Sequence, residues 1–287
     1  MLTMFALPKP FRGHIGVIQR NAIASWTRLR PRPEIILFGN EEGTAQIAQE
    51  FGVRHLPNVP CNEYGTPLMS GMFELANSVA TANTLCYINS DILVLCDLVN
   101  ATQQVAAWRE QFLMTGRRIN VDLDEPEVYA SADSEARLRE LIRRQNLEIQ
   151  IGAMDYFVFP RGLLRSFPPF TPGGGLWDNW LVWKTLSMGV PVVDASEVVF
   201  VVHQNHGKTT AVYDAINSSE EGRRNQELAG ATFERNGPKG SLCTRADATH
   251  RLTPNGIRST VRQRLLFRLL DKTRSFRHAL GLRRKQY

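Results

Sequence analysis

The chain has 287 residues, of which 43% are hydrophobic and 22% charged, the balance of an ordinary globular protein. This composition excludes a chain that is disordered throughout, a collagen and a coiled coil, and no apolar run approaches the length of a membrane-spanning helix. The net charge of +6 is uneven, because residues 251–287 hold eleven Lys or Arg and one Asp. The first 250 residues are therefore mildly acidic, and we expect no specific nucleic-acid partner.

The targeting and redox signals are weak. The N-terminal apolar run is too short for a secretion signal and has no small-residue cleavage site, so we expect a cytoplasmic protein. The four cysteines form no CxxC pair, and Cys86 and Cys96 lie in or beside an apolar run, which indicates reduced, buried thiols.

The first hundred residues alternate between strand and helix periodicity. Apolar runs predict strands at 2–7, 34–40, 53–57 and 84–95, and helical spacing of apolar residues predicts helices at 15–29, 44–51 and 68–79. This order predicts right-handed βαβ units and a mostly parallel sheet with helices on both faces. Ligands bind beyond the carboxyl ends of such strands. The loops after the first, second and fourth strands are therefore candidate site loops.

The second half is less regular. The sequence predicts a strand running into a loop over 111–123, an acidic turn and helix within 124–150, and a strand within 151–164. A Gly/Pro-rich loop at 167–175 and a helix at 176–189 follow, and then one or two strands within 190–207. We expect a domain over residues 1–206, a polar surface excursion over 207–250 with a short helix near 218–229, and a basic tail over 251–287.

Asn89-Ser90-Asp91 is the sharpest feature. Aspartate is disfavoured within strands, yet apolar residues flank this motif on both sides. A carboxylate at a strand end suits a hard divalent ion that keeps open positions for phosphate oxygens. The alternative is an aspartate that caps a strand-to-helix turn.

His203 and His206 end another apolar strand. Imidazole is a good ligand for Mn or Zn and a poor one for Mg, so these residues are candidate ligands of the same metal as Asp91. A polar loop whose histidines only form hydrogen bonds is the alternative.

Gly173–Gly175 and the helix that follows form a third candidate. Asp178 would lie in the first turn of this helix, where a carboxylate facing a cleft can deprotonate an attacking hydroxyl. Trp177 or Trp180 would stack on an acceptor sugar, and Asn179 would hydrogen-bond to it. A plain helix start with core tryptophans is the alternative.

Several charged or polar residues follow the other strands. Arg117 and Arg118 are suited to holding a diphosphate or an acidic acceptor. Asn40 and Glu41 offer hydrogen bonds to a base or ribose, and Lys9 and Arg12 lie where phosphates would bind. Solvated loops and turns are the alternative reading.

The tail mixes arginines with Leu and Phe. Such segments bind anionic membrane surfaces, so the tail is a candidate for peripheral attachment at the inner membrane face. A solubilising tail is the alternative.

Taken together, these segments resemble the glycosyltransferases of the GT-A fold, in particular bacterial GT-A-like proteins of poorly defined substrate. The resemblance covers roughly residues 1–206 and rests on "PKPF", "ILFGNEEG", "YINSDIL", "GAMDYFVFPRGLL", "GGGLWDNWL" and "VHQNH". It implies a Rossmann-like, three-layer α/β/α fold. It also implies transfer of a sugar from a nucleotide-sugar donor to a hydroxyl of a glycan or lipid-linked acceptor, in glycan or surface polysaccharide synthesis.

The resemblance also implies roles for residues. In this family an Asp-x-Asp motif binds the metal that bridges the diphosphate. Here Asn89 replaces the first aspartate, so Asp91 alone carries over as a carboxylate ligand, completed by His203 and His206. The implied cofactor is a divalent metal, Mn or Mg, with Mn favoured by a histidine ligand. Asp178 matches the catalytic base of inverting members. The expected donor contacts are Pro8, Lys9, Arg12, Asn40, Glu41, Asn89, Ser90, Arg117, Arg118 and Asp155.

Two other functions remain open at this point. A sugar-phosphate nucleotidyltransferase uses a similar sheet and metal, although "LPKPFRGHIG" fits its glycine-rich loop only loosely. A sugar- or membrane-binding module that has lost catalysis would explain Asn89 as a lost ligand.

Overall fold

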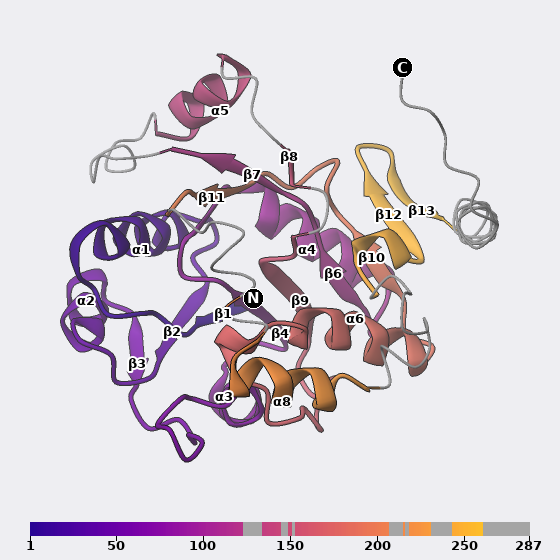
Figure 1. Ribbon diagram of the computed structural model, residues 1–287. Helices are drawn as coiled ribbons and strands as arrows, with labels where there is room; N and C mark the ends of the chain where they lie inside the picture. Colours follow the sequence, from indigo (N-terminus) through magenta and orange to yellow (C-terminus); the bar gives the residue numbers. More distant parts are fainter. Residues whose placement is uncertain are drawn as a thin grey trace, which may run out of the picture.

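The computed structural model describes residues 1–122, 134–144, 149–150, 153–206, 215, 218–230 and 243–260. The expected basic tail beyond residue 260 and much of the expected excursion at 207–250 lie outside this part. The described strands form a nine-stranded sheet with the order β13-β12-β10-β6-β9-β4-β1-β2-β3 and a four-stranded sheet with the order β5-β11-β7-β8 (Figure 1).

The nine-stranded sheet is mostly parallel. Strands β3, β2, β1 and β4 pair in parallel at one side, and β6, β10 and β12 pair in parallel at the other. Between them β9 runs antiparallel to both β4 and β6, and β13 runs antiparallel to β12 at the edge. The strands are β1 (Leu2–Ala6), β2 (Glu34–Phe38), β3 (Arg54–Leu56), β4 (Thr84–Ile88), β6 (Leu113–Thr115), β9 (Tyr156–Pro160), β10 (Val192–Asp194), β12 (His250–Thr253) and β13 (Gly256–Ser259).

Helices cover both faces of this sheet. One core joins the sheet to α1 (Gly13–Thr27), α2 (Thr44–Phe51) and α4 (Asp97–Trp108). The other core joins it to α3 (Met69–Val79) and α6 (Trp177–Ser187), and α8 (Glu220–Leu228) lies beside them (Figure 1). Successive residues of a strand point to opposite faces, so Met4 belongs to the first core and its neighbour Phe5 to the second. This is the three-layer α/β/α arrangement expected from the sequence.

The small sheet begins directly after β4, because its strand β5 follows β4 after a three-residue turn. It contains β5 (Ile92–Val94), β7 (Arg118–Val121), β8 (Ile149–Gln150) and β11 (Val201–Gln204), and α5 (Ser134–Arg144) lies on its outer side (Figure 1). One face is apolar, because Leu93, Val121 and Val202 pack with Leu138 of α5. The opposite face carries Ile92 and His203, which are paired across β5 and β11, and it faces the main domain.

Some predicted elements differ from the observed ones. The run at 84–95 is two strands in two sheets, and the residues expected as a loop after 116 include strand β7. Helix α4 was not predicted. The boundary expected at residue 251 falls inside β12, so the main sheet extends to residue 259. The corrections to the strands have one cause: pairing between distant segments overrides the local pattern.

Two short 3-10 turns complete the described elements, namely η1 (Pro172–Gly174) and η2 (Arg245–Asp247). No helix among the described residues has the length and apolarity needed to cross a bilayer.

Candidate functional site

The Asn89-Ser90-Asp91 turn connects the two sheets. Strand β4 ends at Ile88 in the large sheet, and β5 begins at Ile92 in the small one. The Asn89 backbone N–H donates to the Asp155 carbonyl oxygen at 2.9 Å, and the Gln204 side-chain amide donates to the Asp91 carbonyl oxygen at 3.1 Å. Segments adjoining β9 and β11 therefore hold the turn in place at the carboxyl end of a central strand, where ligands bind in open parallel sheets.

Asp91, His203 and His206 converge at this turn. The Asp91 Oδ2 atom lies 3.6 Å from His203 Nε2 and 3.1 Å from His206 Nε2. Burial raises the pKa of Asp91, but hydrogen bonds and charge attraction from the two imidazoles outweigh burial and hold that pKa well below its usual range. Asp91 is therefore a carboxylate at neutral pH.

This cluster fits a divalent metal ion. One ligand atom from each of its three residues lies within 4.8 Å of the others, and an oxygen with two imidazole nitrogens suits a first-row ion such as Mn²⁺ or Zn²⁺. Asp91 Oδ1 and His203 Nδ1 are buried and make no hydrogen bond. Buried polar atoms in folded proteins are normally paired, so their lack of partners indicates a place where a ligand supplies the contacts.

A second polar group lies beside the turn. The Asn89 side-chain amide and Arg118 Nη1 both donate to Asp155 Oδ1, at 2.9 and 2.8 Å. Burial raises the pKa of Asp155, and the Arg118 guanidinium opposes the rise. Arg118 thus forms an ion pair with Asp155. The sequence analysis expected it to bind a diphosphate or an acidic acceptor instead. Asp155 Oδ2 and Arg118 Nε remain buried without a partner.

Asp178 lies in the first turn of α6. Burial raises its pKa to about 6, with a further contribution from the Asp155 charge, and the Asn179 backbone N–H opposes the rise by donating to Asp178 Oδ1 at 2.9 Å. The helix is entered through Gly175 and through Leu176, whose φ of 65° lies in the left-handed region. Such strain in a non-glycine residue often accompanies functional sites, and here it directs the first turn of α6.

Tyr87 also belongs to this site, although the sequence analysis did not predict it. Its hydroxyl donates to Asn89 Oδ1 at 2.8 Å. Burial raises the pKa of Tyr87, and the charges of Asp91, Asp155 and Asp178 raise it further. All three carboxylates therefore lie near one phenol. Its position two residues before Asn89, near the end of β4, could have indicated its role, but no sequence motif includes it.

The loops after the first two strands make a less compact group. Gln19 of α1 accepts from the Lys9 backbone N–H at 2.7 Å and from Ser90 Oγ at 2.8 Å, so it ties the first loop to the Asn89-Ser90-Asp91 turn. Pro8 is buried beside it. Arg12 is exposed and pairs with Glu42, and Asn40 and Glu41 are exposed as well. Arg117 donates its backbone N–H to Ser196 Oγ at 2.8 Å.

The expected acceptor contacts at the start of α6 are engaged within the protein. Trp177 is 6% exposed, and its ring packs edge-on against Tyr87 at 5.0 Å and against Phe157 at 5.7 Å. Its ring belongs to the core, in contrast to the expected stacking on a sugar. Asn179 donates its side-chain amide to the Cys243 carbonyl oxygen at 2.8 Å.

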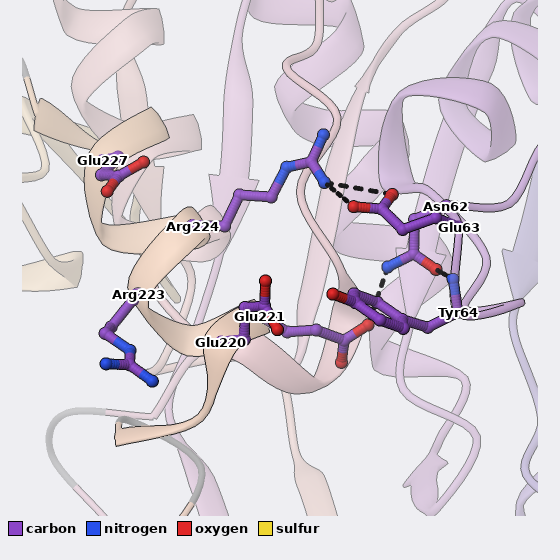
Figure 2. A pocket seen from close by; sticks show the side chains of 8 residues that line it. All are labelled: Asn62, Glu63, Tyr64, Glu220, Glu221, Arg223, Arg224 and Glu227. Carbon is purple, nitrogen blue, oxygen red and sulfur yellow. Dashed lines mark hydrogen bonds and ion pairs between the residues drawn. The ribbon is translucent and has the colours of Figure 1, made fainter.

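A separate pocket of about 340 Å³ lies between the loop after β3 and helix α8. Figure 2 shows its polar lining: Arg224 pairs with Glu63 at 3.0 Å, and Asn62 donates to Glu221 at 2.8 Å. These bonds tie the loop to the helix. None of the predicted site residues lines this pocket.

The arrangement can be compared with known structures. The glucosyl-3-phosphoglycerate synthase of Mycobacterium tuberculosis, solved with Mn²⁺, UDP-glucose and phosphoglyceric acid, matches with a TM-score of 0.50 and 16% identity over 80% of each chain. The GT-A-like fold expected from the sequence is confirmed. A second match is S. aureus TarS residues 1–349 in complex with UDP-GlcNAc, at a TM-score of 0.45 and 10% identity over 80% of this chain and 66% of that one.

The similarity is one of fold. At 16% identity the synthase says nothing about which residues of this chain are functional, and the TarS match is too weak to support an argument. No protein-family model matches the chain, and no curated protein matches its sequence.

Proposed function

We propose that this protein is a glycosyltransferase that moves a sugar from a nucleotide-sugar donor to an acceptor hydroxyl with the help of a divalent metal. The observation that carries the proposal is the convergence of Asp91, His203 and His206 at the carboxyl end of β4, in a sheet of GT-A-like fold. The synthase of similar fold was solved with Mn²⁺ and UDP-glucose, which supports the same class of donor and cofactor here.

Asp91, His203 and His206 would hold the metal, preferably Mn²⁺ because two of the three ligands are imidazoles. When bound, such an ion neutralises negative charge on the oxygens of a diphosphate. The single carboxylate at position 91 is sufficient for this role because both histidines add ligand atoms within reach. The Asn89 side chain, which stands where the resemblance implies a second aspartate, is used instead to hold Asp155.

Asp178 would act as the general base. The bond from the anomeric carbon to the β-phosphate oxygen breaks, and a new bond forms between that carbon and the acceptor oxygen. The acceptor proton passes to the Asp178 carboxylate, and the nucleoside diphosphate leaves with the electron pair of the broken bond. Attack from the face opposite the leaving group inverts the anomeric centre. A base with a pKa of about 6 is ionised at neutral pH and still accepts a proton readily.

The basic tail bears on where the enzyme acts. Residues 261–287, which follow the last strand of the large sheet, carry nine basic side chains, so we propose that this segment binds anionic lipid and brings the enzyme to lipid-linked acceptors. Removal of residues 261–287 should abolish co-sedimentation with phosphatidylglycerol vesicles. Co-sedimentation equal to that of the full chain would contradict this placement.

Calorimetry with a panel of UDP- and GDP-sugars, each with and without Mn²⁺, tests the function. We expect one nucleotide sugar to bind only with the metal and to be hydrolysed slowly in the absence of acceptor. Binding without any hydrolysis would indicate an inactive module. Turnover of a nucleoside triphosphate with a sugar phosphate would indicate a nucleotidyltransferase.

A further inference from the structure

Buried polar atoms without a hydrogen-bond partner gather at the junction of the two sheets. Of the nine such side-chain atoms among the described residues, five belong to the groups around the turn. They are Asp91 Oδ1, Arg118 Nε, Asn120 Oδ1, Asp155 Oδ2 and His203 Nδ1. Four of these belong to residues already assigned to the site, and Asn120 has no assigned role.

Asn120 and His203 are direct neighbours in the small sheet. They pair across the parallel ladder between β7 and β11, so their side chains project from the same face of the sheet. Ile119 and Val202, one residue earlier on each strand, pack on the opposite face with Leu138. The register therefore places an amide oxygen that lacks a donor beside a ring nitrogen that lacks a partner.

Metal binding would make this pairing necessary. His203 directs Nε2 toward Asp91 Oδ2, at 3.6 Å, so Nε2 is the atom that would bind the metal. A neutral imidazole that coordinates through Nε2 carries its proton on Nδ1. That proton is buried, because His203 is 7% exposed. A buried N–H donor needs an acceptor, and Asn120 Oδ1 is the unused acceptor on the paired residue.

We propose that Asn120 is a positioning residue of the metal site: its side-chain oxygen accepts a hydrogen bond from His203 Nδ1–H and so holds the imidazole with Nε2 toward the metal. The inference rests on the proposed function only in requiring a metal at Asp91, His203 and His206. Asn120 does not contact the metal, the donor or the acceptor. Loss of such a supporting hydrogen bond typically weakens metal binding by about 10- to 100-fold.

The test compares Asn120→Ala, Asn120→Asp and wild type by calorimetric titration with Mn²⁺. Asn120→Ala should weaken binding at least about tenfold, whereas Asn120→Asp, which keeps an acceptor oxygen, should stay close to wild type. The matched control is Asn77→Ala, another partly buried asparagine, whose side chain bonds to Phe73 and Gly162 away from the site. This control should bind Mn²⁺ as wild type does.

A spectroscopic measurement separates positioning from packing. In ¹⁵N-histidine-labelled protein with Zn²⁺ as a diamagnetic probe, the Nδ1–H proton of His203 should be visible in wild type and in Asn120→Asp, because a hydrogen bond slows its exchange. It should be lost in Asn120→Ala. Equal Mn²⁺ affinity of Asn120→Ala and wild type would overturn the inference, and so would equal weakening in both Asn120 variants.

His203→Ala distinguishes failure of this inference from failure of the proposed function. If His203→Ala loses Mn²⁺ and Asn120→Ala does not, only the role of Asn120 is wrong. If wild type itself binds no Mn²⁺, or if His203→Ala binds it as wild type does, the metal site and the role of Asn120 both fall.

Discussion

The two sheets of this protein differ in the side chains that they bury. The central strands of the nine-stranded sheet are buried on both faces by apolar side chains, and Phe73 lies in an aromatic cluster with Phe167 at 4.4 Å and Phe159 at 5.7 Å. The four-stranded sheet packs one apolar face against α5, and its opposite face mixes apolar residues of the main core, such as Ile92 and Val201, with polar ones. Its other face presents His203 and Asn120 to the turn that carries Asp91.

The difference shows where stability and chemistry come from. Apolar burial in the large sheet stabilises the fold, whereas the junction concentrates buried polar atoms that make no internal bond. Such atoms destabilise a fold unless something else satisfies them. The polar atoms at the junction therefore lower the stability of the fold, which apolar burial in the large sheet offsets. The same junction holds the candidate ligands Asp91, His203 and His206 next to strands β5 and β11 or within them.

Asp178→Asn should have the largest effect on catalysis while leaving the fold intact. The amide keeps the shape of the side chain and cannot accept the acceptor proton, so kcat should fall about 10²- to 10⁴-fold with little change in donor affinity. Since burial raises the pKa of Asp178 to about 6, wild-type kcat should rise with pH up to about pH 6 and level off above it. Steady-state kinetics from pH 5 to 8 check both. Turnover within tenfold of wild type would refute the base assignment.

The same substitution should change stability in the opposite direction. The folded state holds the Asp178 proton more tightly than the unfolded state does, so wild type loses stability as pH rises from 3.8 to about 6. Asp178→Asn has no such loss. Its Tm should exceed that of wild type at pH 8, and the difference should disappear at pH 3. A lower Tm for the variant at pH 8 would show that the carboxylate is needed for folding.

Asp91→Ala should remove the metal while leaving the large sheet intact. Loss of the only carboxylate in the cluster should reduce kcat about 10²- to 10³-fold, the size expected for losing one electrostatic stabiliser. Mn²⁺ should no longer raise the Tm, because a ligand stabilises only the folded state that binds it. A variant whose Tm still rises with Mn²⁺ as in wild type would place the ion elsewhere.

Arg118→Met tests the cost of the buried polar group beside the turn. The substitution leaves the buried Asp155 without its 2.8 Å ion pair, so the free energy of unfolding should fall by about 3 kcal/mol. Adding Asp155→Leu removes the unpaired acidic group and should restore most of that loss of stability. Urea denaturation of the single and double variants measures the effect. Equal stability of Arg118→Met and wild type would argue that the pair is open to water.

Phe73→Leu tests the contribution of the large sheet's core to stability alone. The aromatic cluster loses a ring but keeps an apolar side chain, so the free energy of unfolding should fall by about 1 kcal/mol. The kcat of the folded enzyme should not change, because Phe73 belongs to the core under α3 and not to the junction. A loss of kcat larger than the loss of folded protein would show that the two regions are coupled.

The sequence predicted the large sheet better than the small one. Alternating strand and helix periods in the first hundred residues indicated β1 to β4 and their helices, because each of those units is local. The small sheet pairs β5 with β11 and β11 with β7 across about a hundred residues, and no local pattern encodes such pairing. Helix α4 was missed because its polar residues Asn100, Gln103 and Gln104 weaken the apolar stripe.

Some residues of the candidate site could likewise be predicted from the sequence, and others could not. Asp91, His203 and His206 could be singled out because an acidic or imidazole side chain at the end of an apolar run is unusual, and Asp178 because it begins a helix after a run of glycines. Asn120 and Tyr87 carry no such mark, and their relevance appears only from the ladder register and from the hydrogen bond to Asn89. Trp177 shows the converse, since an aromatic residue next to a glycine-rich loop lies in the core.

The metal site can be tested by anomalous diffraction from crystals grown with Mn²⁺ and UDP. We expect one strong manganese peak bonded to the Asp91 carboxylate and to ring nitrogens of His203 and His206, with the diphosphate oxygens on its open side. A manganese peak bound to UDP but away from Asp91, or UDP bound with no manganese at this cluster, would contradict it.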